Sequence, residues 1–88
     1  MARIDAMEGG SAGADRVASG EFFFELGISC SSGRNGATDL VEAHKWFNLA
    51  AMQGYAEAAE FRQEVARELS REAVAAAQRA ARDFVATH

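Results

Sequence analysis

The stretch DLVEAHKWFNLAAMQGYAEA, from Asp39 to Ala58, contains a helix start, an apolar face and a helix stop at matching spacings. Asp39 is a favourable N-cap, and Glu42, three residues on, can bond back to the amide of the cap. The apolar face repeats at the i, i+3, i+4 spacing of a helix and comprises Ala43, Trp46, Phe47, Ala50 and Ala51. Gly54 can adopt the left-handed conformation that ends a helix, and Tyr55 then folds back on the last turn.

The helix expected before this stretch carries three consecutive phenylalanines, Phe22 to Phe24, which span about 200° of its surface. Ser19 is placed to cap it. The side chains within about 60° of Leu26 form its inward face: Phe22, Phe23 and Cys30. Phe24 and Ile28 fall on the opposite side, so one neighbouring helix cannot cover all of these side chains.

Two more helices are expected after the stretch, each with an apolar stripe. The third carries Ala58, Phe61, Val65 and Leu69, with glutamates on its polar side. Ser70 interrupts the chain and caps a fourth helix, whose stripe is Val74, Ala77, Ala81, Phe84 and Val85. Arg79 and Asp83 are expected to pair on its surface. The sequence therefore predicts an all-α fold of four helices, over 19–31, 39–53, 56–69 and 71–87, arranged as two antiparallel αα-hairpins.

The composition predicts one small domain and disfavours several classes of partner. The chain has 88 residues and a net charge of −4, which argues against general binding to nucleic acid or to an anionic membrane. It has a single cysteine and no apolar run near the roughly 18 residues that cross a bilayer. The first residues lack the apolar region of a secretion signal, so we expect a cytoplasmic protein. Residues 1–14 have the composition of a flexible tail, and 15–88 form the helical domain.

Residues that carry chemistry are few, and none has the companions that chemistry needs. His44 lies about 100° from the inward direction and is expected on the solvated rim of its helix. Cys30 has no partner motif for a metal site and is expected as a small buried hydrophobe. The glycine pairs lack the lysine and the strand of a phosphate loop. We expect no catalysis, no cofactor and no metal, so the protein is not expected to be an enzyme.

Ten positions form a ladder that resembles a Sel1-like repeat, the TPR-related helix–turn–helix unit. They are Leu26, Gly27, Gly33, Asp39, Ala43, Trp46, Ala50, Ala51, Gly54 and Ala58. The resemblance covers about 22–58 and implies a minimal Sel1/TPR-like solenoid fragment that binds other proteins, of the kind abundant in bacteria. It implies packing roles for these residues: Gly27 for close helix approach, Trp46 as the core anchor and Gly54 as the helix stop.

The chain departs from the family pattern in four places, one of which is Phe22, at a position that the family usually fills with alanine. Cys30 stands where the family usually has an aromatic residue, and the turn after Gly33 differs from the usual Gly-x-Gly-Val. Arg62 and Gln63 stand where a second repeat would have Leu-Gly. The resemblance therefore implies one repeat followed by a divergent helical C-terminal cap.

The expected function is a non-catalytic protein–protein interaction module, a small adaptor or accessory subunit that docks on a larger protein or enzyme complex. The candidate partner-binding side chains face away from the seam between the first two helices: Phe24, Ile28, Val41, Asn48 and Met52. Either a partner covers these residues, or the later helices or the N-terminal tail do.

Two other functions remain open on the sequence. A second copy can complete the small core, which would make the protein a homo-oligomer with a structural role. A small nucleic-acid-linked regulator is the other alternative, because Arg71, Arg79 and Arg82 lie on the fourth helix, although Glu72 and Asp83 interrupt them.

Overall fold

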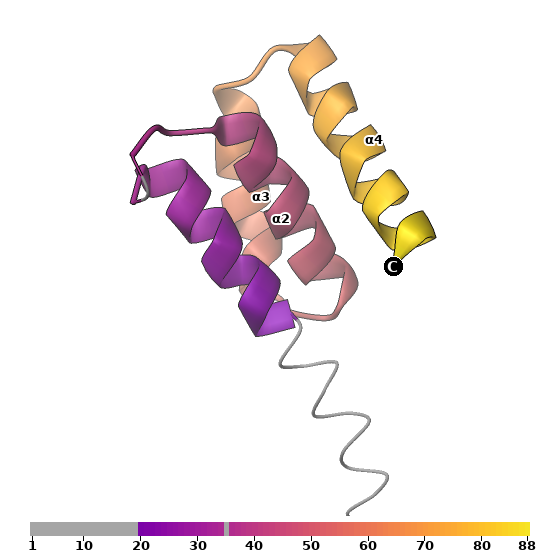
Figure 1. Cartoon of the computed structure of the whole chain (residues 1–88). Coiled ribbons are helices and arrows are strands. Elements are labelled where there is room, and N and C mark those ends of the chain that lie inside the picture. Colours follow the sequence, from indigo (N-terminus) through magenta and orange to yellow (C-terminus); the bar gives the residue numbers. More distant parts are fainter. Residues whose placement is uncertain (1–19, 35) are drawn as a thin grey trace, which may run out of the picture.

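A computed structural model of the chain describes residues 20–34 and 36–88, and these form four helices without strands (Figure 1). The N-terminal helix is described over 20–32. It is followed by α2 (Leu40–Met52), α3 (Glu57–Arg67) and α4 (Arg71–Thr87). The predicted all-α class is confirmed, and the helix bounds are close to the predicted ones. The predicted tail over 1–14, the start of the domain at residue 15 and the cap at Ser19 lie outside the described residues.

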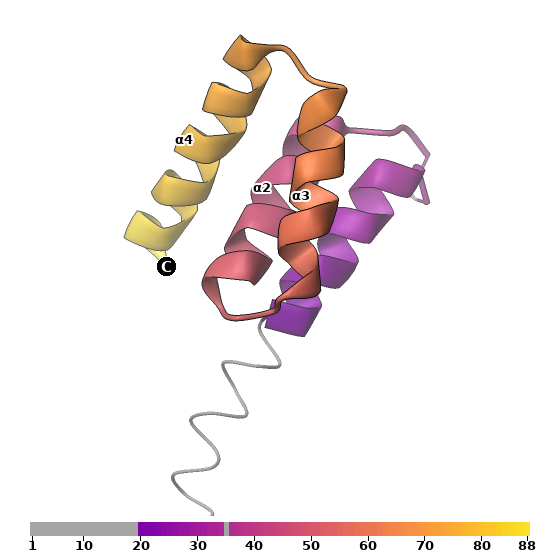
Figure 2. The same cartoon turned by 180° about the vertical axis from the view of Figure 1, so that it is seen from behind.

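The second helix, α2, is the centre of the arrangement. The chain runs up the N-terminal helix, down α2, up α3 and down α4, so that α4 runs parallel to α2 on the side away from the N-terminal helix (Figure 1). Seen from behind, α3 lies across α2 and next to the N-terminal helix (Figure 2). Both α3 and α4 make extensive contact with α2. This central position explains why the stretch from Asp39 to Ala58 specifies so much of the fold.

Two side-chain caps start helices where the sequence places them. The Glu42 amide donates to Asp39 Oδ1 at 3.1 Å, and the Ala73 amide donates to Ser70 Oγ at 3.0 Å. The prediction that the Glu42 carboxylate accepts a hydrogen bond from the Asp39 amide is wrong. The Asp39 amide donates instead to the Cys30 carbonyl at 2.9 Å, and the Glu42 carboxylate pairs with Lys45 Nζ at 3.2 Å.

The end of α2 has the predicted geometry. Gly54 has a φ of +92°, its amide donates to the Ala51 carbonyl at 3.0 Å, and the Tyr55 amide donates to the Ala50 carbonyl at 3.1 Å. This pair of bonds is a Schellman motif, which satisfies the last carbonyls of the helix and turns the chain into α3.

The core is built around Phe47, which is fully buried on α2. Its ring lies 5.6 Å from that of Phe24 and 5.5 Å from that of Phe61, measured between ring centroids. Gly27 lies directly against it: a Cβ there would be 2.5 Å from a ring carbon of Phe47. The rest of the core is small or aliphatic: Ala43, Ala50, Ala58 and Val65. The core thus joins the N-terminal helix, α2 and α3.

The expectation that Trp46 anchors the core is wrong, because Trp46 is only half-buried and Phe47 takes that place. Trp46 instead belongs to a second aromatic cluster beneath α4. Its ring stacks on Phe23 at 5.7 Å and meets the edge of Phe84 at 5.4 Å. Phe22, expected on the inward face, is 60% exposed.

Two polar residues also differ from expectation. His44 is buried, with 2% of its surface exposed, because α2 is covered on nearly every side. Arg79 and Asp83 form no ion pair, and within residues 20–34 and 36–88 the one ion pair is Lys45–Glu42. No helix in these ranges is both long and apolar enough to span a bilayer.

Candidate functional site

The structure separates the five residues expected to bind a partner, starting with those of the N-terminal helix. Phe24 is buried, with its ring 4.9 Å from that of Tyr55 and 5.0 Å from that of Phe61. Ile28 is half-buried and packs against the same core. The prediction that Phe24 is a docking residue is therefore wrong, and the alternative that the third helix covers it is confirmed.

The three candidates on α2 have different surroundings. Val41 is half-buried. Asn48 is half-buried as well, and its Oδ1 accepts a hydrogen bond from the Arg62 guanidinium at 2.7 Å. Met52, at the end of the helix, is 57% exposed. The five candidates, expected to face away from the seam of the first two helices, thus have different surroundings: Phe24 lies in the core, Asn48 contacts α3, and Met52 remains exposed.

An open groove of about 290 Å³ lies where the N-terminal helix, α2 and α3 meet, and we call it the α3 groove. Its principal lining residues are Thr38, Leu40, Phe61, Val65, Glu64 and Glu68. Buried Phe47 closes its floor, and Phe61 leaves 38% of its surface exposed there. The groove therefore offers a partly open aromatic ring and aliphatic side chains beside two carboxylates.

The carboxylates of the α3 groove belong to a longer acidic row. Glu57, Glu60, Glu64 and Glu68 follow α3 at intervals of three or four residues and are all exposed. On a helix this spacing places them along one side, about one turn apart. None of them forms an ion pair, since the one ion pair among the described residues lies on α2.

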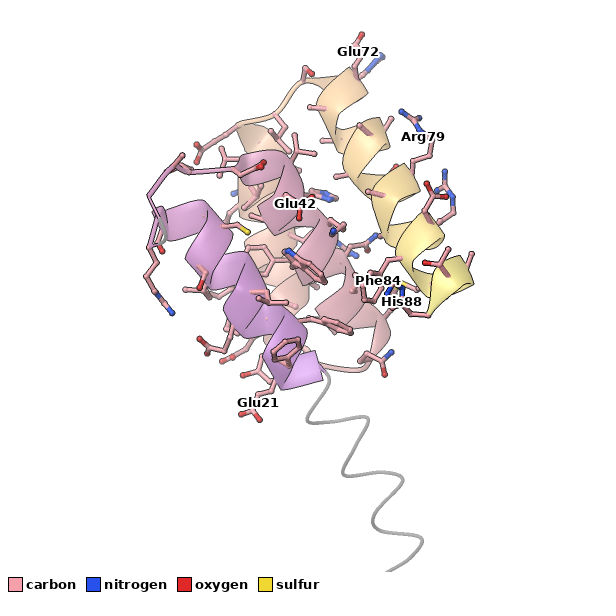
Figure 3. The ribbon with its side chains drawn as sticks, in the orientation of Figure 1. Glu21, Glu42, Glu72, Arg79, Phe84 and His88 are labelled. Carbon is pink, nitrogen blue, oxygen red and sulfur yellow. The ribbon has the colours of Figure 1, made fainter. Side chains whose placement is uncertain are left out.

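The neighbouring end of the N-terminal helix is acidic as well. Glu21 and Glu25 are exposed there, and Glu21 points away from the end of the helix bundle (Figure 3). Partial burial, followed by the charges of Glu57, Glu21 and Glu25, raises the pKa of the Tyr55 phenol. Tyr55 therefore lies in a negative electrostatic field that both helices produce.

A second groove, of about 420 Å³, lies between the C-terminal ends of α2 and α4, and we call it the α4 groove. It is lined by Phe23, Leu49, Gln53, Phe84, Val85 and His88. Phe84 and His88 lie together at its edge, with their rings stacked at 4.2 Å (Figure 3). Val85 is half exposed. Unlike the α3 groove, this groove has no carboxylate among its lining residues.

Two titratable residues in the described part of the chain, Cys30 and His44, have pKa values that burial shifts. Partial burial, followed by the charges of Glu42 and Asp39, raises the pKa of the Cys30 thiol, so the thiolate is disfavoured. Burial, followed by the charge of Arg62, lowers the pKa of His44, and its Nδ1 has no hydrogen-bond partner. No three metal-ligating side chains gather among the residues that the structure describes.

Sequence reasoning missed the α3 groove. It placed Phe61 and Val65 in the packing stripe of the third helix and took the glutamates for a solvated face. The sequence did contain an indication of a partly exposed Phe61, because this residue lies on the side of its helix where the apolar stripe meets the glutamates. Only the position of the neighbouring helices shows that the stripe is incompletely covered there.

Comparison of the chain with protein-family models, with curated proteins and with solved structures found no match.

Proposed function

We propose that the protein is a non-catalytic protein–protein interaction module that docks on a larger protein through the α3 groove. The observation that carries this proposal is the groove itself, in which the Phe61 ring remains 38% exposed above an aromatic core. Concave apolar sites with a polar edge are where interfaces concentrate their binding energy. A small adaptor or accessory subunit needs no more than such a site on a rigid scaffold.

The α3 groove is preferred to the α4 groove as the docking site for two reasons. In the α4 groove, Phe84 is engaged by the stacked His88 and by the edge contact with Trp46. In the α3 groove the Phe61 ring contacts Phe24 and Phe47 but Phe61 is still 38% exposed, and the carboxylates of the groove form no ion pair within the described residues. A charged edge supplies the orientation and selectivity that an apolar surface lacks.

We also propose that the scaffold is a Sel1-like repeat with a divergent helical cap. Two of the residues that carry the resemblance have the packing that it implies. Gly27 lets the N-terminal helix approach the Phe47 ring, and Gly54 ends α2 in a left-handed conformation. Proteins with such repeats bind other proteins, which agrees with the proposed function.

A matched pair of bulky substitutions tests the docking site. Thr38→Trp places an indole at the exposed edge of the α3 groove, and Ala75→Trp places one on the exposed side of α4. The tagged full-length chain and both variants are purified from source cells, and co-eluting proteins are identified by mass spectrometry. We expect a partner that is retained by the parent and by Ala75→Trp but lost from Thr38→Trp.

Two results would contradict the proposal. One is a partner that binds all three chains equally, which would place the interface elsewhere. The other is a stable homodimer, seen by light scattering of the purified chain, that Thr38→Trp dissociates. That result would replace the adaptor by self-association through the same groove.

A further inference from the structure

We propose that the α3 groove recognises a basic amphipathic helix, which inserts one large apolar side chain beside Phe61 and pairs lysines or arginines with the glutamates of α3. This inference deepens the proposed function and rests on it. It specifies the chemistry of the partner: a helix with one apolar anchor and basic residues one turn apart.

The apolar part of the α3 groove determines which side chain of the partner enters it. Leu40, Phe61 and Val65 come from two helices and surround the groove above the buried Phe47. The residues that line it are apolar or uncharged, apart from the two carboxylates at its edge. A leucine or phenylalanine that enters it removes apolar surface of both chains from water, which stabilises the complex.

The charged part of the site sets the spacing of the partner. Glu60, Glu64 and Glu68 recur every four residues, so they lie about 6 Å apart along the axis of α3. A second helix laid along α3 presents basic side chains at the same interval when they stand at i, i+4 and i+8. An irregular segment has no such periodicity, which is why the site favours a helix.

The basic residues nearest to the groove do not neutralise this row. Arg62 donates to Asn48 on the side of α3 that faces α2. Arg67 follows Glu64 by three residues but forms no ion pair with it. At the N-terminal end of α3, partial burial and then the charges of Glu57, Glu21 and Glu25 raise the pKa of Tyr55, so this end also carries negative charge. A basic partner relieves this repulsion, whereas a phosphate backbone or an anionic lipid surface increases it.

The test uses three synthetic peptides of about 15 residues, long enough for marginal helicity in water. The first has one leucine among alanines, with lysines at i, i+4 and i+8 on the same side. The second replaces the lysines by glutamates, and the third replaces the leucine by alanine. Binding to the full-length chain is measured by fluorescence anisotropy, and the binding site is located from amide chemical shifts in the NMR spectrum of the labelled protein.

We expect the lysine–leucine peptide to bind and to shift the amides of Leu40, Phe61 and Val65. The glutamate peptide should bind at least about tenfold more weakly, because like charges face each other across the interface. Raising the salt from about 50 to about 500 mM should weaken binding of the lysine peptide, because the Debye length shrinks. Loss of the leucine anchor should weaken binding at either salt concentration.

Charge-reversal variants of the protein make the test specific to the groove. Glu64→Lys combined with Glu68→Lys should lower the affinity of the protein for the lysine peptide by at least about tenfold. The control is Glu72→Lys combined with Asp83→Lys, which changes the net charge equally on exposed positions of α4. The control should change the affinity by less than about threefold, which is the long-range effect of net charge alone.

The outcomes separate this inference from the proposed function. If the glutamate peptide binds the groove as well as the lysine peptide, the basic partner is wrong but the docking groove stands. If no peptide shifts the amides of the groove at millimolar concentration, the basic helix is wrong, and the docking groove is then decided by the Thr38→Trp comparison alone. Equal losses in the groove variant and in the α4 control would mean that net charge alone attracts the peptide, which overturns the inference.

Discussion

Gly27 and Gly54 are both required by the fold, for different physical reasons. Gly27 is helical and lies against the Phe47 ring, whereas Gly54 has a φ of +92° and open space where a Cβ would be. The first glycine serves packing and the second serves backbone conformation. Alanine at the two positions therefore tests two separate interactions.

Gly27→Ala should destabilise the protein, because the new methyl would lie 2.5 Å from a Phe47 ring carbon. Overpacking of this kind costs about 1–3 kcal/mol, and the better helix propensity of alanine returns about 1 kcal/mol of it. Gly54→Ala should cost about 1 kcal/mol through backbone strain alone. Urea denaturation measures both changes. The discriminating result is rescue: Phe47→Leu should offset part of the loss in Gly27→Ala and none of it in Gly54→Ala.

Phe47 and Trp46 are neighbours on α2 with different burial, and their truncation should show it. Phe47→Ala leaves a cavity at the centre of the core and should cost about 3–5 kcal/mol, enough to unfold a domain of this size. Trp46→Ala removes a half-buried ring beneath α4 and should cost less, so that the variant still melts cooperatively. Thermal melts followed by circular dichroism compare them. If Trp46→Ala lowers the melting temperature more than Phe47→Ala does, the aromatic cluster under α4, rather than Phe47, holds the fold together.

His44 should make the stability of the protein depend on pH. Its pKa is lowered from the ordinary value by burial first and by Arg62 second. Above the unfolded-state pKa of about 6.5, His44 is neutral in both states and contributes no dependence. Below it the unfolded chain gains a proton that the folded chain excludes, so stability should fall as the pH falls towards the lower folded-state pKa.

Urea denaturation at a series of pH values from about 7.5 to about 5 tests this dependence. His44→Leu is the matched variant, because it keeps a side chain of similar size and removes the titrating group and its unpartnered Nδ1. In this variant, the free energy of unfolding should depend less on pH, because the contribution of His44 is removed. If the parent and the variant lose stability identically on acidification, His44 is not the group responsible.

At the scale of the elements, α4 differs from the other three helices in how it is held. It packs along α2 with small side chains, since Ala77 and Ala81 are its buried residues, and Phe84 supplies its large contact. Small side chains bury little apolar surface, so the start of α4 depends on local interactions. The cap at Ser70 is the main one, because its Oγ accepts the Ala73 amide at 3.0 Å.

Ser70→Ala should destabilise the start of α4 by about 1 kcal/mol, the usual effect of losing a side-chain cap. Hydrogen exchange should accelerate first at the amides of the first turn of α4. Exchange at the amides of α2 should change less, because they are protected by the core around Phe47. Ser70→Asp is the control, since aspartate also caps and should preserve the protection. Uniform acceleration across all helices would instead mean that the cap stabilises the whole fold cooperatively.

For the whole molecule, the notable property is an uneven distribution of charge. Carboxylates line α3 and the end of the N-terminal helix, whereas arginines and acids alternate along α4, where Glu72 and Arg79 project outward (Figure 3). Glu64 has like charges four residues before and after it, in Glu60 and Glu68. Such pairs are unfavourable in the free protein, which a binding function would explain.

Glu64→Gln should therefore stabilise the free protein slightly, by about 0.2–0.5 kcal/mol at low salt. Glu72→Gln should have the opposite sign, because Glu72 lies in the first turn of α4, where a negative charge favours the helix dipole. Thermal melts at low and high salt measure both effects, and both should shrink as salt screens the charges. Destabilisation by Glu64→Gln would contradict the view that the acidic row is unfavourable in the free chain.

The local pattern of the sequence was sufficient to determine the helices and their ends. Asp39, Ser70 and Gly54 act through bonds within one or two turns, and those bonds do not depend on distant parts of the chain. The apolar periodicity likewise determined that the fold is all-α, because each stripe must be buried against another helix.

The tertiary structure alone decided which faces are covered. It buried Phe24 and His44, left Trp46 half-buried and left Phe61 partly open beside a row of carboxylates. Periodicity assigns a side chain to a face of its own helix, but the exposure of that face depends on where three other helices lie. The central position of α2 and the incomplete cover of α3 are set by long-range packing, which is why the groove emerged only from the folded molecule.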